Sequence, residues 1–133
     1  MIIADDDPII RSALRTLVED LGAEVLSEAD SGDAAIKQAE LHPPDVLLLD
    51  ISMPGIGGFR TAKYLRQHVP QTYIIFISQY SQKVYVEEAL EIGAKGYIVK
   101  GSLVEDLAPA IQSVMDGGTF VSKSISGYTM PAA

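Results

Sequence analysis

The chain has 133 residues, which is the size of one domain, and 47% of them are hydrophobic, enough to bury a core. Its formal net charge of −8 argues against direct binding of nucleic acid by this domain, because phosphate contacts need clustered lysines and arginines. The absence of cysteine excludes disulfides and thiol chemistry. The apolar runs are too short to span a bilayer, and no basic segment typical of a signal peptide precedes the first of them, so we expect a cytoplasmic domain without a membrane partner.

Short apolar runs alternate along the chain with longer segments of helical periodicity, a pattern typical of repeated βα units around a parallel sheet. Five strands are expected, at residues 1–4, 24–28, 45–49, 72–77 and 97–99. A helix is expected after each strand, at residues 8–21, 32–41, 59–69, 82–92 and 103–116. The sequence therefore predicts an α/β fold with five parallel strands and five helices.

The starts of three predicted helices carry recognisable capping residues. Asp7 followed by Pro8 is a favoured pair of N-cap and first helical residue. Ser31 is expected to cap the second helix. Ser102 and Glu105 have the spacing of a capping box, which predicts the start of the last helix.

The last predicted helix contains a local conflict. Pro109 removes one backbone hydrogen bond inside it, so we expect a kink or a later start of the helix. The glycine pair at 117–118 ends the helix. We therefore expect a folded domain at residues 1–118 and a linker or tail at 119–133, with a short extended piece at 119–121.

Polar side chains follow four of the predicted strands at the point where each strand ends. They are Asp5, Asp6, Asp50, Ser78 and Lys100. In an open parallel sheet the carboxyl ends of the strands meet at one edge, where ligands bind. Three carboxylates, a hydroxyl and an ammonium group are therefore expected to converge.

This combination suits a divalent metal and a phosphoryl group. Magnesium prefers oxygen ligands, and a bound cation relieves the repulsion between crowded carboxylates such as Asp5, Asp6 and Asp50. A carboxylate can also attack a phosphoryl group to give an aspartyl phosphate. Lys100 and the metal would stabilise the developing charge, and Ser78 would bond a phosphoryl oxygen. Each residue alone has an ordinary explanation as a cap, a turn or a solvated group, but their joint placement points to one site.

The order of these residues resembles the receiver domain of bacterial two-component response regulators, over about residues 2–117. The resemblance rests on the acidic pair at 5–6, Asp50 with the Met-Pro-Gly at 53–55, Ser78 and Lys100. It implies a flavodoxin-like, doubly wound five-stranded parallel sheet with strand order 2-1-3-4-5, flanked by five helices.

The resemblance also implies a role for each acidic residue. Asp50 matches the phosphoacceptor, which takes a phosphoryl group from a sensor histidine kinase. Asp5 and Asp6 match the acidic pair that holds Mg²⁺ or Mn²⁺ together with Asp50. The backbone carbonyl of Ser52 matches a further ligand of the metal.

A second set of residues matches the family's switch. Ser78 corresponds to the switch hydroxyl, Tyr97 to the switch aromatic and Lys100 to the lysine that contacts the phosphoryl group. In such domains the hydroxyl moves toward the phosphate, the aromatic ring turns inward, and the face formed by the fourth helix, fifth strand and fifth helix changes shape. Tyr80 lies at a position that flanks the path of the hydrolytic water in the family, so we expect it to affect the lifetime of the phosphoryl group.

Smaller features are similar to NarL/LuxR-type regulators, namely the residues at 5–8, the turn at 93–97 and the residues at 117–120. Such regulators carry a C-terminal helix-turn-helix domain after a linker. We expect this chain to be a receiver excised from such a regulator, which would contact DNA only through the output domain that is absent here. A homodimer is compatible with the sequence but is not specified by it.

Three alternatives carry different functions. A magnesium-dependent phosphohydrolase of the haloacid-dehalogenase type would need a second Asp two residues after the nucleophile, where this chain has Ser52. A flavin-binding module would need a phosphate cradle after the first strand, where three aspartates stand instead. An inert pseudo-receiver would not need all the key side chains. We therefore expect a phosphorylation-controlled switch, with self-assisted phosphoryl acceptance and slow autodephosphorylation, and not a turnover enzyme.

Overall fold

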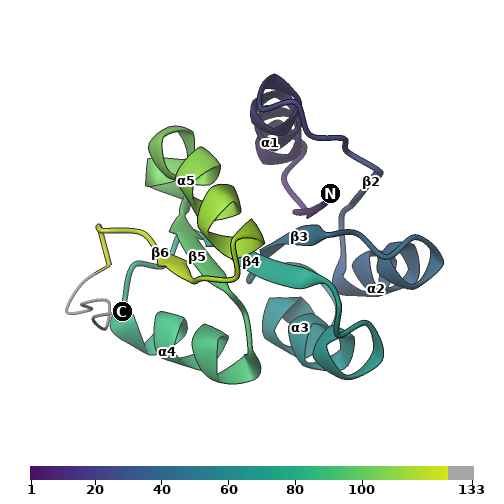
Figure 1. Ribbon diagram of the computed structural model, residues 1–133. Coiled ribbons are helices and arrows are strands. Elements are labelled where there is room, and N and C mark those ends of the chain that lie inside the picture. Colours follow the sequence, from purple (N-terminus) through teal and green to yellow (C-terminus); the bar gives the residue numbers. More distant parts are fainter. Residues whose placement is uncertain (126–133) are drawn as a thin grey trace.

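The computed structural model describes residues 1–125, which form a parallel β-sheet with helices on both faces (Figure 1). The sheet has six strands in the order β2-β1-β3-β4-β5-β6. The strands are β1 (Ile2–Ala4), β2 (Ser27–Ala29), β3 (Val46–Asp50), β4 (Tyr73–Ser78), β5 (Gly96–Val99) and β6 (Phe120–Val121). The helices are α1 (Pro8–Asp20), α2 (Gly32–Leu41), α3 (Gly57–His68), α4 (Lys83–Ile92) and α5 (Leu103–Met115), with a 3₁₀ turn, η1 (Lys100–Ser102), before α5. The predicted α/β class and the order of the first five strands are confirmed, but the predicted number of strands was wrong.

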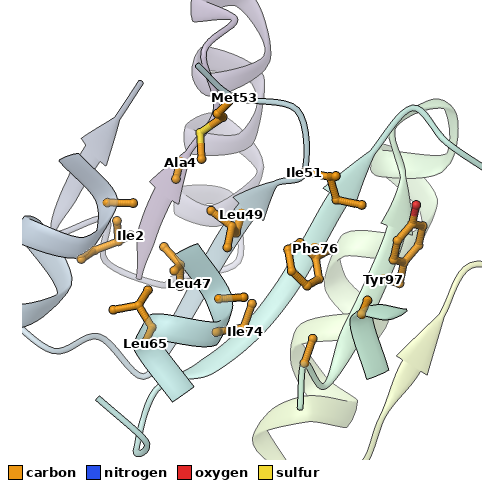
Figure 2. Close-up of a cluster of buried hydrophobic side chains, with 14 of the residues drawn as sticks. Ile2, Ala4, Leu47, Leu49, Ile51, Met53, Leu65, Ile74, Phe76 and Tyr97 are labelled. Atoms are coloured by element: carbon orange, nitrogen blue, oxygen red, sulfur yellow. The ribbon is translucent and has the colours of Figure 1, made fainter. Parts of the chain in front are cut away.

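Two hydrophobic clusters hold the helices to the sheet, one on each face. Alternate residues of a strand point to opposite faces, so Leu47 and Leu49 of β3 join one cluster and Leu48 joins the other. The first cluster packs under α2, α3 and α4, and Figure 2 shows its centre, with Phe76 and Tyr97 from the neighbouring strands. The second cluster packs under α1 and α5. Both faces of the central strands are thus buried, which explains why their sequences are continuous apolar runs.

All three predicted helix starts are confirmed, but only two of the three predicted capping bonds form. The Asp7 carboxylate accepts a hydrogen bond from the Ile9 N–H at 2.8 Å, with Pro8 as the first helical residue. The Ser31 hydroxyl accepts one from the Ala34 N–H at 3.2 Å.

The capping box at Ser102 was wrong. The 3₁₀ turn η1 leads directly into α5, and Ser102 has φ −109° and ψ 14° instead of the extended backbone of an N-cap. Its hydroxyl therefore caps nothing and lies 3.3 Å from the hydroxyl of Ser124.

Helix α5 runs from Leu103 through Pro109 to Met115, so the later start that we considered is wrong. Pro109 and Glu105, one turn earlier, are both exposed. Water can therefore reach this side of the helix and hydrogen-bond the carbonyl that the proline leaves without a partner, which lowers the penalty for keeping the helix continuous.

The segment after α5 turns back and adds a sixth strand to the sheet. The N–H of Phe120 donates to the carbonyl of Lys95 at 2.9 Å, and the N–H of Ser122 donates to the carbonyl of Tyr97 at 3.0 Å. Val121 and Ile125 are buried. The extended piece expected at 119–121 is therefore a strand, and the chain up to Ile125 packs on the domain where we expected a linker. The rest of that predicted linker, 126–133, lies outside the described residues.

Candidate functional site

Four neighbouring strands end at the same edge of the sheet and carry the predicted site residues there. Strand register sets Ala4 beside Leu49, so the residues that follow them, Asp5 and Asp50, come to lie next to each other. Ser78 ends β4. Lys100 directly follows β5. The structure thus brings together the polar groups that the sequence placed at strand ends.

The three carboxylates form a compact acidic cluster. One oxygen each from Asp5, Asp6 and Asp50 lies within 4.8 Å of the other two. Asp5 and Asp50 are buried, whereas Asp6 is exposed. Asp5 Oδ1 accepts a hydrogen bond from the Asp7 N–H at 2.8 Å, whereas Asp5 Oδ2 accepts no well-aligned hydrogen bond among residues 1–125 and has only an ion pair with Lys100 Nζ, 3.1 Å away. A buried acceptor of this kind, beside two further carboxylates, fits an oxygen-seeking divalent cation.

Lys100 bridges the two buried carboxylates. Its Nζ lies 3.1 Å from Asp5 Oδ2 and 3.4 Å from Asp50 Oδ2, and its side chain is only 22% exposed. Burial lowers the pKa of Lys100, but the Asp50 and Asp5 carboxylates outweigh that effect and raise the pKa above its ordinary value. The lysine is therefore a fixed ammonium group at physiological pH.

The Asp50 carboxylate is held in one orientation, and the charges around it are negative overall. Its Oδ1 accepts a hydrogen bond from the Ser52 N–H at 3.1 Å. Burial and the charge of Asp5 raise the pKa of Asp50 to about 6, against the opposing effects of the Ser52 N–H and Lys100. One lysine does not compensate three acids, so the cluster gains from an added cation.

The loop after Asp50 comes very close to the start of α3, and a glycine permits this. A Cβ on Gly58 would lie 2.6 Å from Ile51 Cα, closer than side chains approach a backbone. The Gly58 N–H donates to the Ile51 carbonyl at 2.8 Å. Helix α3 therefore anchors the loop that follows Asp50.

A network of hydroxyl groups connects the loop after β4 to the site. The Ser78 hydroxyl accepts a hydrogen bond from the Tyr80 N–H at 2.9 Å, and the Tyr97 hydroxyl donates to the Tyr80 carbonyl at 2.7 Å. The Tyr97 ring is fully buried beside Phe76 (Figure 2), and burial raises the pKa of its hydroxyl. The Tyr80 ring stacks on Tyr85 at a centroid distance of 4.5 Å. The backbone of Tyr80 is thus held by two of the three residues that the sequence predicted as a switch, Ser78 and Tyr97.

A sequence profile of the Response regulator receiver domain matches residues 1–112. The chain belongs to this family. Among curated relatives, Response regulator GacA of Pseudomonas syringae pv. syringae (strain B728a) is 33% identical over 128 residues, which cover 95% of this chain and 59% of the relative. Response regulator UvrY of Escherichia coli (strain K12) is 30% identical over 127 residues, covering 95% of this chain and 58% of the relative. The receiver therefore spans somewhat more than half the length of these relatives.

Solved receiver structures share the fold. A two-component response regulator of the LuxR family from Aurantimonas sp. SI85-9A1 superposes with a TM-score of 0.89 at 29% identity, covering 94% of this chain and 90% of that chain. The isolated receiver domain of RcsB from Salmonella enterica serovar Typhimurium, in the presence of the phosphomimetic BeF₃⁻, has a TM-score of 0.87 at 29% identity, covering 94% of both chains. The predicted resemblance to the LuxR-type receivers and the flavodoxin-like fold are confirmed. None of the helices formed by residues 1–125 is long and apolar enough to cross a bilayer.

One polar residue that contacts the site of this receiver was not singled out in the sequence. Arg11 of α1 donates from Nη1 to the backbone carbonyl of Asp5 at 2.7 Å. The sequence indicated this contact only by a basic residue one turn into the helix that follows the aspartates at 5–7. That signal is weak, because most such arginines extend into solvent.

Proposed function

We propose that this receiver accepts a phosphoryl group from a sensor histidine kinase onto Asp50 and that this change controls an attached output domain. The observation that carries the proposal is the position of the Asp50 carboxylate, which is 2% exposed and lies beside Asp5 and the Lys100 ammonium. In the transfer, a carboxylate oxygen of Asp50 forms a bond to phosphorus as the bond from phosphorus to the kinase histidine nitrogen breaks.

Asp5, Asp6, Asp50 and the backbone carbonyl of Ser52 would hold Mg²⁺ or Mn²⁺. When bound, the cation supplies positive charge to the phosphoryl oxygens, as in other phosphoryl transfers. The remaining work falls to the chain itself. The Ser52 N–H orients the Asp50 carboxylate through Oδ1, and Lys100 places a positive charge near Oδ2.

Ser78, Tyr97 and Lys100 would convert phosphorylation into a change of shape. The Ser78 hydroxyl is held by the Tyr80 N–H, and the Tyr97 hydroxyl is held by the Tyr80 carbonyl. A phosphoryl oxygen on Asp50 is a stronger acceptor for the Ser78 hydroxyl than the neutral groups around it. Movement of Ser78 would thus pull on the Tyr80 backbone and on Tyr97, and so alter the face formed by α4, β5 and α5.

The output is proposed to be a helix-turn-helix domain that binds DNA. One support is that the curated relatives are longer than this chain. A second is the structure of the response regulator RcsB in complex with DNA, which has a TM-score of 0.86 to this chain. Another structure contains two RcsB dimers bound to DNA, which makes a homodimer a reasonable proposal here as well. A receiver of this kind would work in the cytoplasm, where the kinase presents its phosphohistidine.

The proposed role is a switch and not a turnover enzyme. Ser52 stands where a phosphohydrolase of the haloacid-dehalogenase type needs its second Asp, and residues 1–125 contain no additional domain that could cover a substrate. Release of product from an aryl phosphate in clear excess over the protein would contradict this reading.

The decisive experiment is intact-mass spectrometry after incubation with acetyl phosphate, with and without Mg²⁺, on the parent and on Asp50→Asn. One added phosphoryl group that requires Mg²⁺ and is absent in the variant supports the proposal. If none is added, binding of beryllofluoride is measured next, since rapid hydrolysis would hide a labelled state. Failure of both would favour a pseudo-receiver that acts only through protein contacts.

A further inference from the structure

The backbone carbonyl of Asp5 is left without a partner by the sheet. Strand β1 ends at Ala4, and the Asp5 N–H still donates to the Ala29 carbonyl of β2 at 3.0 Å. The Asp5 carbonyl, in contrast, accepts its hydrogen bond from Arg11 Nη1 at 2.7 Å. Arg11, a side chain of α1, therefore reaches back across the loop at residues 5–7. It supplies the hydrogen bond that the sheet does not provide to the Asp5 carbonyl.

Arg11 is itself held in place from β2. Its Nε lies 3.4 Å from Glu28 Oε1, and its side chain is only 21% exposed. Glu28 also accepts a hydrogen bond from Arg15 Nε at 2.7 Å. The Glu28 carboxylate partly neutralises the Arg11 guanidinium group and holds it in place. The main effect of Arg11 on the acidic cluster is therefore to fix the position of the Asp5 backbone, and its positive charge contributes less.

We propose that Arg11 is a positioning residue for the divalent cation of this site. Its bond to the Asp5 carbonyl fixes the plane of the Asp5–Asp6 peptide, and that plane sets the directions in which the two carboxylates leave the backbone. Asp5 is further restrained through its Oδ1, but Asp6 is exposed and its carboxylate accepts no hydrogen bond within residues 1–125. The orientation of Asp6 therefore depends mainly on the backbone that Arg11 holds. This inference rests on the proposed metal binding by Asp5, Asp6 and Asp50.

Charge and geometry predict opposite effects when Arg11 is removed. If Arg11 acted only as a nearby cation, Arg11→Ala would make the site more negative and would tighten Mg²⁺ binding. If it positions the loop, Arg11→Ala weakens Mg²⁺ binding. Arg15 provides a matched control, because it pairs with the same Glu28 but, within the described part of the chain, forms neither a hydrogen bond nor an ion pair with Asp5.

The test is calorimetric titration of Mg²⁺ into the metal-free protein for the parent, Arg11→Ala, Arg11→Lys and Arg15→Ala. Partners of metal ligands are typically worth about 10- to 100-fold in metal affinity, so we expect a loss of about tenfold for Arg11→Ala. Arg15→Ala should stay close to the parent. Arg11→Lys keeps the charge but not the planar fork that binds Asp5 and Glu28 together, so its affinity should lie between those of the parent and Arg11→Ala.

Thermal unfolding in EDTA shows whether each variant is folded, and Arg11→Lys carries the test if Arg11→Ala is not. An affinity of Arg11→Ala equal to or tighter than that of the parent would overturn the positioning role, as would an Arg11→Lys variant indistinguishable from the parent. Absence of Mg²⁺ binding by the parent would overturn the proposed metal site and this inference together. A loss of Mg²⁺ affinity in the Arg11 variants but not in Arg15→Ala supports both the metal site and the positioning role of Arg11.

Discussion

Replacing Asp50 with asparagine is expected to stabilise the metal-free receiver at neutral pH, although it removes the proposed phosphoacceptor. Burial and the neighbouring charge of Asp5 raise the pKa of Asp50 from 3.8 to about 6. The folded protein therefore binds a proton more readily than the unfolded chain between those two pH values. It follows that folding stability falls as the pH rises from about 4 to 6, and that the full penalty is present above pH 6.

The size of the effect follows from the shift in pKa. A change of one pKa unit corresponds to about 1.4 kcal/mol, so a shift from 3.8 to about 6 corresponds to about 3 kcal/mol at pH 7.5. Asparagine loses the attraction to the Lys100 ammonium but retains an oxygen for the Ser52 N–H. We therefore expect Asp50→Asn to raise the free energy of unfolding by about 1–3 kcal/mol at pH 7.5, and by much less at pH 4.

The measurement is urea unfolding of the parent and Asp50→Asn in EDTA at several pH values between 4 and 8. Asp20→Asn serves as the control, because it makes the same chemical change at an exposed residue at the end of α1, outside the acidic cluster. Addition of Mg²⁺ should stabilise the parent and have little effect on Asp50→Asn. If Asp50→Asn is no more stable than the parent at pH 7.5, or if its gain is the same at pH 4, the argument from burial and crowded charge is wrong.

Three further predictions use single substitutions. Lys100→Ala should raise the pKa of Asp50 further, because the ammonium lies 3.4 Å from its carboxylate; carboxyl-carbon NMR titration measures this, and an unchanged pKa would contradict the ion pair. Lys100→Ala should also weaken the coupling between phosphorylation and output. If phosphorylation of the variant gives the same output as in the parent, this role of Lys100 is wrong. Tyr80→Ala should shorten the lifetime of the phosphoryl group severalfold by opening the path of water; equal dephosphorylation rates in the parent and the variant would refute this. Ser122→Ala should lower the free energy of unfolding by about 1–2 kcal/mol, because the buried hydroxyl bonds both β5 and α5, whereas Ser124→Ala at an exposed hydroxyl should change it little in the same urea unfolding experiment.

The secondary structure was largely predictable because its causes are local. The apolar run at 46–49 in β3 is buried on both faces, and its residues alone indicate a central parallel strand. Asp7 and Ser31 cap their helices through bonds to N–H groups two and three residues away, so the interaction is visible in the sequence. Ser102 shows the limit of this reasoning. It is the last residue of a 3₁₀ turn, so its backbone is not extended and its hydroxyl does not cap α5.

The sixth strand was only partly predictable. Two residues are too few for a periodic pattern, and the segment becomes a strand because the edge of β5 offers it free backbone partners. Burial of Val121 and Ile125 then holds it there. The sequence contained both residues, but nothing in it indicated which surface would receive them.

The sequence by itself determined which residues meet at the candidate site, because polar residues that follow parallel strands must gather at one edge of the sheet. Tertiary structure decided how they meet. The distances from Lys100 to Asp5 and Asp50, the raised pKa of Asp50 and the reach of Arg11 to the Asp5 carbonyl all depend on side chains that are far apart along the chain. Such contacts depend on strand register, helix packing and the exclusion of water, which no local pattern of residues encodes.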